Sequence, residues 1–261
     1  IGDGQKLSLR VHTNGDYYNA VSLSFTEPWL GGKKPNALSV GVYYSYQDDG
    51  FWNTSGQSEY HVGILGGSVS LATRLKWPDD YFTFVHGIAY QQYNVKNYST
   101  LTAMPTGISN NINYNFTIAR NSVDQLIYPR QGSDVSLQAQ MTFPYSLVNG
   151  KDYSNLSSQE RYKWLEYYKV NIRAAWYFNL FDDLVVSTRA RFGFLGQYNS
   201  KVGYSPFERF YLGGDGLTGY NIDGRELVSL RGYEDLSLSP NGGGMVFDKY
   251  TMELRYPITL S

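Results

Sequence analysis

Residues Val135–Phe143 read VSLQAQMTF, and every second side chain of this stretch is apolar. Successive side chains of a β-strand point to opposite faces of its sheet, so the stretch predicts a strand with one apolar and one polar face. The run Ile112–Arg120 alternates in the same way and is joined to it through Tyr128–Ser133, YPRQGS, which we expect to form a tight turn. The two runs therefore predict an antiparallel pair.

The same alternation recurs along the chain and brings the expected number of strands to about ten. The further runs are Lys6–His12, Tyr18–Thr26, Ala37–Gln47, His61–Trp77, Tyr81–Val95, Tyr168–Phe178, Leu184–Phe194 and Val246–Ile258. The run that begins at His61 is interrupted by Gly63, Gly66 and Gly67, which predict a bulge or bend there.

The connections between these runs alternate in length. Short ones lie near Pro28, Pro78, Pro129 and Asp182, and long ones near Asp48, Asn97, Asn149 and Gly213. Several runs reach the roughly 9–11 residues that a tilted strand needs to cross a bilayer. Short turns at one end and long loops at the other are typical of outer-membrane barrels. We therefore expect an all-β fold, a transmembrane antiparallel up-and-down β-barrel over residues 1–261. A soluble β-sandwich is the alternative, but it does not require charged side chains on one face of so many strands.

Composition agrees with a barrel wall that is apolar outside and polar inside. Charged residues make up 17% of the 261 residues, and the chain holds 25 Tyr and 27 Gly. The formal net charge of −1 gives no basic footprint for nucleic acid. No run approaches the ~18 consecutive apolar residues of a membrane helix, so we expect no helical span. The chain opens at Ile1 directly into strand-like sequence, and we expect that a leader has been removed.

The sequence gives little support for catalysis or for a metal site. It contains no cysteine, which excludes disulfides and thiolate chemistry. His12, His61 and His86 lie on different runs without ligand spacing, and there is no G-x-S-x-G nucleophile elbow. Paired aspartates at 48–49, 79–80 and 182–183 fall in turns, where local backbone bonding explains them and calcium is the alternative. We expect a protein that is not an enzyme and that has no cofactor or metal.

One segment, Tyr198–Gly244, breaks the alternation because it is long and rich in glycine. Loops of this length inside a compact domain are usually functional or disordered. Its flank Pro206–Gly214, PFERFYLGG, holds too many aromatic residues for ordinary disorder. Its most conspicuous feature is the arginine of Leu230–Tyr233, LRGY. We expect an ordered extracellular loop over residues 199–245 that packs against the barrel.

Several short motifs resemble those of BamA-type outer-membrane assembly factors, which belong to the outer membrane protein 85 superfamily. The motifs are FERFYLGG at Phe207–Gly214, LRGYE at Leu230–Glu234 with Ser239-Pro240 after it, SFTEPWL at Ser24–Leu30, YPRQGS at Tyr128–Ser133 and MEL at Met252–Leu254. They follow the family's order and cover nearly the whole chain. The resemblance implies a larger barrel, of about sixteen strands, preceded by periplasmic domains. This chain would be an internal piece, from about the third strand to the twelfth, without the periplasmic domains and the terminal strands.

The resemblance also implies that the loop folds into the lumen, where Arg231 meets an acidic residue of the inner wall. Strand parity sets Glu253 opposite Met252 and Leu254, the lipid-facing set, so Glu253 should point into the lumen. A buried arginine needs a carboxylate partner, and a guanidinium–carboxylate pair would fix the loop through two hydrogen bonds. The alternative is that Arg231 lies in a solvated surface loop.

The expected site consists of the loop motif, its partner and the residues that support the loop. The motif is Leu230, Arg231, Gly232 and Tyr233, in which Gly232 would allow a positive φ and Tyr233 would be an aromatic wedge. The partner is Glu253, and the loop support is Phe207, Phe210, Tyr211, Gly213 and Gly214. One departure from the family is an insertion, Asp215–Ser229, which contains LTGY at Leu217–Tyr220, a near-copy of the motif without its arginine.

For function, the resemblance implies the central subunit of the machinery that assembles outer-membrane proteins. The protein would sit in the bacterial outer membrane and insert β-barrel clients at a seam between its first and last strands, where client strands add by edge pairing. The expected partners are unfolded outer-membrane protein clients, accessory subunits such as lipoproteins, and outer-membrane lipids, with no nucleic acid. The alternatives are a two-partner-secretion-type protein exporter of the same superfamily and a passive porin.

Overall fold

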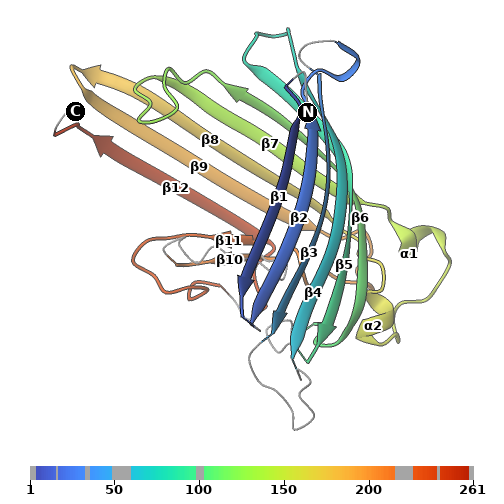
Figure 1. Cartoon of the computed structure of the whole chain (residues 1–261). Coiled ribbons are helices and arrows are strands. Elements are labelled where there is room, and N and C mark those ends of the chain that lie inside the picture. The colour runs from blue at the N-terminus through green and yellow to red at the C-terminus, as the bar shows by residue number, and fades with distance from the viewer. Residues whose placement is uncertain are drawn as a thin grey trace.

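The computed structural model describes residues 4–15, 17–32, 36–48, 60–97, 103–214, 226–239 and 242–258. Ten strands form one antiparallel sheet, in which neighbours in space are neighbours along the chain apart from the step from β9 to β12 (Figure 1). These strands are β1 (Lys6–Asn14), β2 (Tyr18–Glu27), β3 (Asn36–Asp48), β4 (His61–Arg74), β5 (Phe82–Lys96), β6 (Gly107–Asn121), β7 (Gly132–Thr142), β8 (Tyr168–Phe181), β9 (Leu184–Gly196) and β12 (Val246–Arg255). The all-β, up-and-down antiparallel arrangement predicted from the sequence is confirmed.

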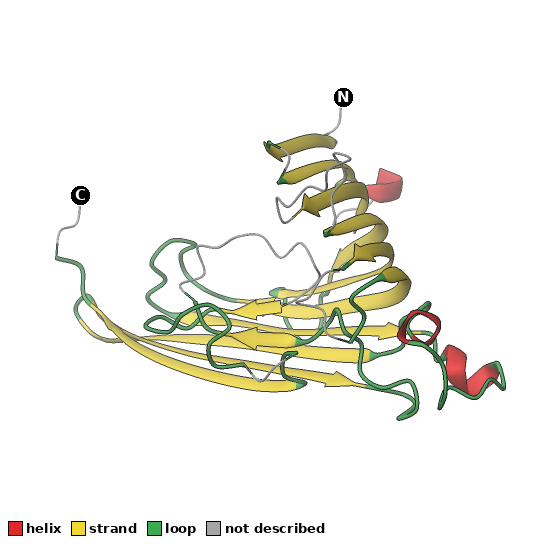
Figure 2. Cartoon of the chain, turned by 90° about the horizontal axis from the view of Figure 1, so that it is seen from below, coloured by secondary structure: helices red, strands yellow, loops and turns green. Residues whose placement is uncertain are grey.

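The sheet is curved and open, as expected for part of a barrel. Its two edge strands are β1 and β12. Figure 2 shows the strands bending around a concave side. The described part of the chain between β9 and β12 contacts this side, where Glu208 binds Lys169 of β8. Within that segment two short strands, β10 (Phe210–Leu212) and β11 (Glu226–Val228), form a separate parallel pair. The concave face is therefore the one that the long loop covers.

The alternation of the sequence sorts side chains between the two faces of the sheet. Leu9, Leu23 and Val42 are direct neighbours across β1, β2 and β3, and all are exposed. Residues of the other parity in β8 and β9, such as Asn171 and Ser187, are buried. An apolar outer face and a polar inner face are the arrangement that a membrane barrel requires.

The glycines of β4 do not form a bulge, one of the two irregularities predicted from the sequence. The pairing of β4 with both neighbouring strands is continuous along its length. Gly66 lies directly opposite Tyr43 of β3, and a Cβ atom at position 66 would overlap the Tyr43 ring. The prediction of a bulge was wrong, and Gly66 instead makes room for an aromatic ring on the adjacent strand. The same arrangement recurs at Gly196 opposite Tyr168 and at Gly193 opposite Phe247.

The connections differ between the two ends of the sheet (Figure 1). At the end where β1 begins and β12 ends, β2 is followed by the 3-10 helix η1 (Leu30–Gly32). At the opposite end, the β7–β8 connection carries α1 (Tyr145–Val148) and α2 (Ser158–Arg161). The β6–β7 connection runs from residue 122 to residue 131 and is therefore wider than the tight turn predicted. Across it, Asp124 Oδ1 accepts hydrogen bonds from the backbone N–H groups of Arg130 and Gln131. None of the helices in the described ranges is long and apolar enough to span a membrane.

Candidate functional site

The loop between β9 and β12 is packed onto the concave face through two phenylalanines that are completely buried. The Phe207 ring stacks on Tyr93 of β5, with ring centroids 4.2 Å apart. Phe210 meets Phe247 of β12 edge to face, at 4.8 Å between centroids. Both rings belong to one buried cluster that also contains Val228 of β11. The described part of the loop is therefore an ordered element with its own apolar core.

The loop-support glycines and the LRGY motif are brought together by backbone hydrogen bonds. Gly214 donates its N–H to the carbonyl of Tyr233 at 3.0 Å, and its own carbonyl accepts from Leu230 N–H at 2.8 Å. Gly213 has a φ of 126° and Gly214 a φ of 85°, in the region that favours glycine. A Cβ at Gly213 would also overlap the Glu234 carbonyl. These glycines therefore hold the motif through close backbone contact, and Tyr211, at 5% exposure, anchors the strand ahead of them.

Within the motif, the backbone has the predicted special conformation, and the side chains of Arg231 and Tyr233 are exposed. Gly232 has a φ of 87°. Arg231 is exposed, and the Tyr233 side chain is 52% exposed. The near-copy at Leu217–Tyr220 and the insertion up to position 225 lie outside the described residues.

Glu253 lies on the concave face, opposite Ser187 of β9. Its carboxylate accepts from Arg255 at 2.6 and 2.9 Å and lies 3.6 Å from Arg189. Arg231 acts on Glu253 only as a more distant charge, and the two form no ion pair within the ranges described. The predicted pairing of Arg231 with Glu253 thus stays a prediction. To form it, Arg231 would compete with two arginines that the wall itself supplies.

The sequence led us to expect a cation on the loop and a carboxylate on the wall. In the buried ion pair that docks the loop, the carboxylate is on the loop and the cation is on the wall. Glu208, on the loop, accepts from Lys169 Nζ of β8 and from the Tyr167 hydroxyl, both at 3.2 Å. The side chains of Lys169 and Glu208 are 5% and 9% exposed. Burial, and next the Glu208 charge, raise the pKa of Tyr167 well above its usual value, so that this phenol stays a hydrogen-bond donor. A second carboxylate of the loop, Glu226, lies 3.2 Å from the same lysine.

Sequence reasoning missed Glu208 and Glu226 although part of the signal was available. Strand parity places Lys169, Arg173 and Arg191 on the inner face of adjacent runs, and a loop that covers such cations must bring carboxylates to them. Because Arg231 of the LRGY motif is conspicuous in the sequence, we expected the loop to supply a cation rather than a carboxylate.

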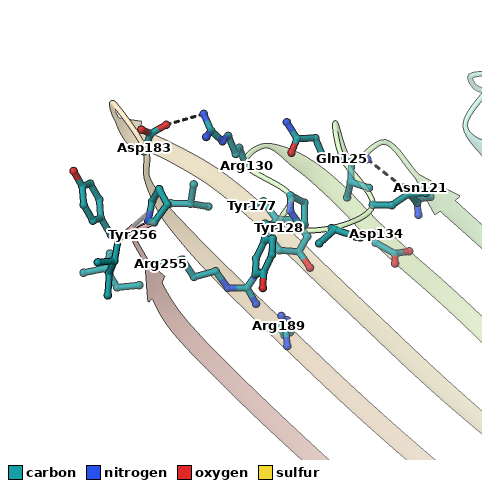
Figure 3. A pocket seen from close by; sticks show the side chains of 18 residues that line it. Asn121, Gln125, Tyr128, Arg130, Asp134, Tyr177, Asp183, Arg189, Arg255 and Tyr256 are labelled. Carbon is teal, nitrogen blue, oxygen red and sulfur yellow. Dashed lines mark hydrogen bonds and ion pairs between the residues drawn. The ribbon is translucent and has the colours of Figure 1, made fainter. Parts of the chain in front are cut away.

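A second feature of the concave face is a cavity of about 1230 Å³ at the end that carries the short turns. Figure 3 shows Tyr128 of the β6–β7 connection reaching toward Arg189 and Arg255, and the ion pair between Arg130 and Asp183, which is 2.7 Å long. The cavity thus borders the wall arginines that hold Glu253. Apolar residues of the connection and of the chain after β12 complete its lining, among them Leu126, Ile127, Pro129, Tyr256 and Ile258.

Comparison with known proteins places this architecture in a family. In the structure of BamA from Haemophilus ducreyi lacking POTRA domains 1-3, the fold matches with a TM-score of 0.69 at 18% sequence identity, over 99% of this chain and 49% of that chain. The chain thus spans about half the length of that protein, and at this identity the likeness is one of fold. The model of the Omp85 superfamily domain matches residues 1–261. Since that match extends over every residue, the chain belongs to the Omp85 superfamily.

Proposed function

We propose that this chain is the barrel part of the central subunit of an outer-membrane protein assembly machinery, which folds β-barrel proteins and inserts them into the bacterial outer membrane. Membership of the Omp85 superfamily and the BamA-like fold support an assembly role at the level of the family. The observation that carries the proposal is the docked loop, in which Gly214 is hydrogen-bonded to both ends of Leu230–Tyr233 while Phe207 and Phe210 are buried against the wall.

The proposed mechanism is not enzymatic and uses no cofactor. The clients are unfolded outer-membrane proteins, whose strands would add to a strand edge by main-chain hydrogen bonding. The apolar outer face of the wall would contact outer-membrane lipids, and accessory lipoproteins would bind elsewhere on the full protein. The chain described here contributes a rigid wall and the docked loop that holds the LRGY motif at a fixed place on its inner face.

A passive porin requires an open polar lumen, and the packed loop on the concave face disfavours it. A protein exporter of the same superfamily shares the fold, so activity has to separate it from an assembly factor. Folding and export predict different results for the purified full-length protein in lipid vesicles.

The test is the rate at which an unfolded outer-membrane barrel folds into vesicles that contain the full-length protein. We expect folding to be faster than in empty vesicles and slower again with Arg231→Ala. Lys201→Ala, which removes an exposed cation of the same β9–β12 connection, should have no effect. No acceleration by the unmodified protein would overturn the proposal. No acceleration together with passage of a secreted polypeptide across the vesicle membrane would assign the protein to export.

A further inference from the structure

Three cations lie in one row across the concave face. Arg173 of β8 is the direct cross-strand partner of Arg191 of β9, and Arg191 is the direct partner of Lys249 of β12. Like charges directly opposite one another destabilise a pair of strands. The sheet itself places no carboxylate in this row, since its fourth member on β7 is Ser136. A row of this kind requires an anion from outside the sheet.

Glu226 supplies that anion from the loop. Its carboxylate lies 3.5 Å from Arg191 and 3.8 Å from Arg173. It also lies 3.2 Å from Lys169, which is on the same face of β8 as Arg173, four residues earlier. It also accepts from Asn171 Nδ2 at 3.1 Å, and its side chain is only 19% exposed. An isolated surface ion pair is weak because water screens it, whereas a largely buried carboxylate among three cations is screened much less.

The third cation of the row binds the same loop segment through its backbone. Lys249 Nζ donates to the carbonyl of Ser229. The residue after Ser229 is Leu230, the first of the LRGY motif, whose N–H is bound to the Gly214 carbonyl. The four residues Glu226–Ser229 therefore lie over the cationic row and lead directly into the motif.

We propose that Glu226 is a positioning residue that holds the segment Glu226–Ser229 on the row of Arg173, Arg191 and Lys249 and thereby fixes where the LRGY motif begins. This gives a role to the described end of the insertion Asp215–Ser229, which the family pattern does not explain. The placement of the segment is independent of the proposed function, and only its use in assembly rests on that function.

The test uses Val228→Cys in the full-length protein in outer-membrane preparations. Val228 is completely buried and these 261 residues contain no cysteine. Once any cysteine outside this chain is replaced, an engineered thiol at position 228 reports whether the segment lifts from the wall. We expect a water-soluble maleimide to label this thiol slowly, and about tenfold faster when Glu226→Gln is added, the ratio that a loss of about 1.4 kcal/mol produces. Glu234→Gln, which neutralises an exposed carboxylate of the same loop, should leave the rate unchanged.

A second thiol separates release of the segment from loss of the whole loop. The second position is Val62→Cys, on the wall strand β4, where the side chain is completely buried in the same apolar cluster. Its labelling rate should not change with Glu226→Gln. A parallel rise at both positions would overturn the proposal, because Glu226 would then support the entire loop rather than this segment.

A double-substitution cycle tests the electrostatic cause. Arg191→Gln alone should also accelerate labelling of Val228→Cys, but it should add little when Glu226 is already Gln, since coupled residues are not additive. An unchanged rate with Glu226→Gln would overturn the proposal even if client folding proceeds normally, and normal labelling behaviour with no client folding would overturn only the proposed function.

Discussion

At the scale of the residue, Glu253 shows how the wall satisfies its own charges. Arg255 lies two residues away on the same face of β12, and Arg189 lies on the neighbouring strand. Removing the carboxylate therefore deprives both arginines of the carboxylate that they contact. Removing Arg231 breaks no ion pair with the described residues of the wall, because Arg231 is exposed.

We accordingly expect Arg231→Ala and Glu253→Ala to differ in stability while both reduce assembly of outer-membrane proteins. Glu253→Ala should lower stability by about 0.5–1 kcal/mol, since the side chains are partly exposed and screened. Arg231→Ala should leave stability unchanged. The measurements are thermal unfolding of the barrel and outer-membrane protein levels in cells that depend on the variant. Partial rescue by exchanging the two charges would support the pairing, and normal assembly in both single variants would contradict it.

Asp124 controls the β6–β7 connection through its charge. Desolvation of the carboxylate alone would raise the pKa of Asp124, but the combined hydrogen bonds from backbone amides, among them those of Arg130 and Gln131, outweigh it and lower this pKa below its usual value. A depressed pKa means that the carboxylate stabilises the connection above its ordinary pKa and that this contribution is lost as the pH falls through the lower, folded-state value. We expect the two amides to lose hydrogen-exchange protection in that acidic range, after correction for the intrinsic exchange rate. With Asp124→Asn, protection of the same amides should not depend on pH there, and a parent without this dependence would contradict the assignment.

At the scale of the element, the glycine–aromatic pairs give neighbouring strands a fixed register. Gly66 receives the Tyr43 ring, and a methyl group there would overlap it. We expect Gly66→Ala to destabilise the sheet by about 1–3 kcal/mol, the usual cost of overpacking. Gly63→Ala in the same strand is the matched control, because its nearest neighbours would lie 3.9 Å away. Thermal midpoints of the two variants check this, and equal midpoints would show that Tyr43 moves aside without cost.

The strands could be predicted because their signal is local. Period-two alternation in a run such as Val135–Phe143 depends only on that run, and the structure confirms the strand as β7, at Gly132–Thr142. The parallel pairing of β10 with β11 and the binding of Glu226 to Lys169 join residues far apart in sequence, and no local pattern records them. The role of Gly66 was missed for the same reason, because it depends on the Tyr43 ring of the neighbouring strand β3. The part of the site that could be predicted was the inward face of Glu253, which parity alone decides.

At the scale of the whole molecule, the exposed apolar side chains of the sheet form a surface suited to lipid. Val42 is 54% exposed at the centre of β3. We expect Val42→Lys to cost about 2–4 kcal/mol if it lies near the middle of the bilayer. Leu126→Lys, on a turn beyond the strands and 93% exposed, should cost nearly nothing. Folding equilibria in lipid vesicles measure both, and a neutral Val42→Lys would contradict the outward orientation of this face.

The two buried phenylalanines of the loop have a mechanical consequence. Phe207 touches β5, and Phe210, three positions later, touches β12, although five steps between neighbouring strands separate β5 from β12. Measured along the sheet those steps amount to about 24 Å, so the loop is a noncovalent cross-brace across its curve. Widening the sheet would pull the two aromatic contacts apart, and forcing the loop out would let the sheet flatten. The curvature of the sheet and the position of the loop are therefore coupled, so that neither can change without the other.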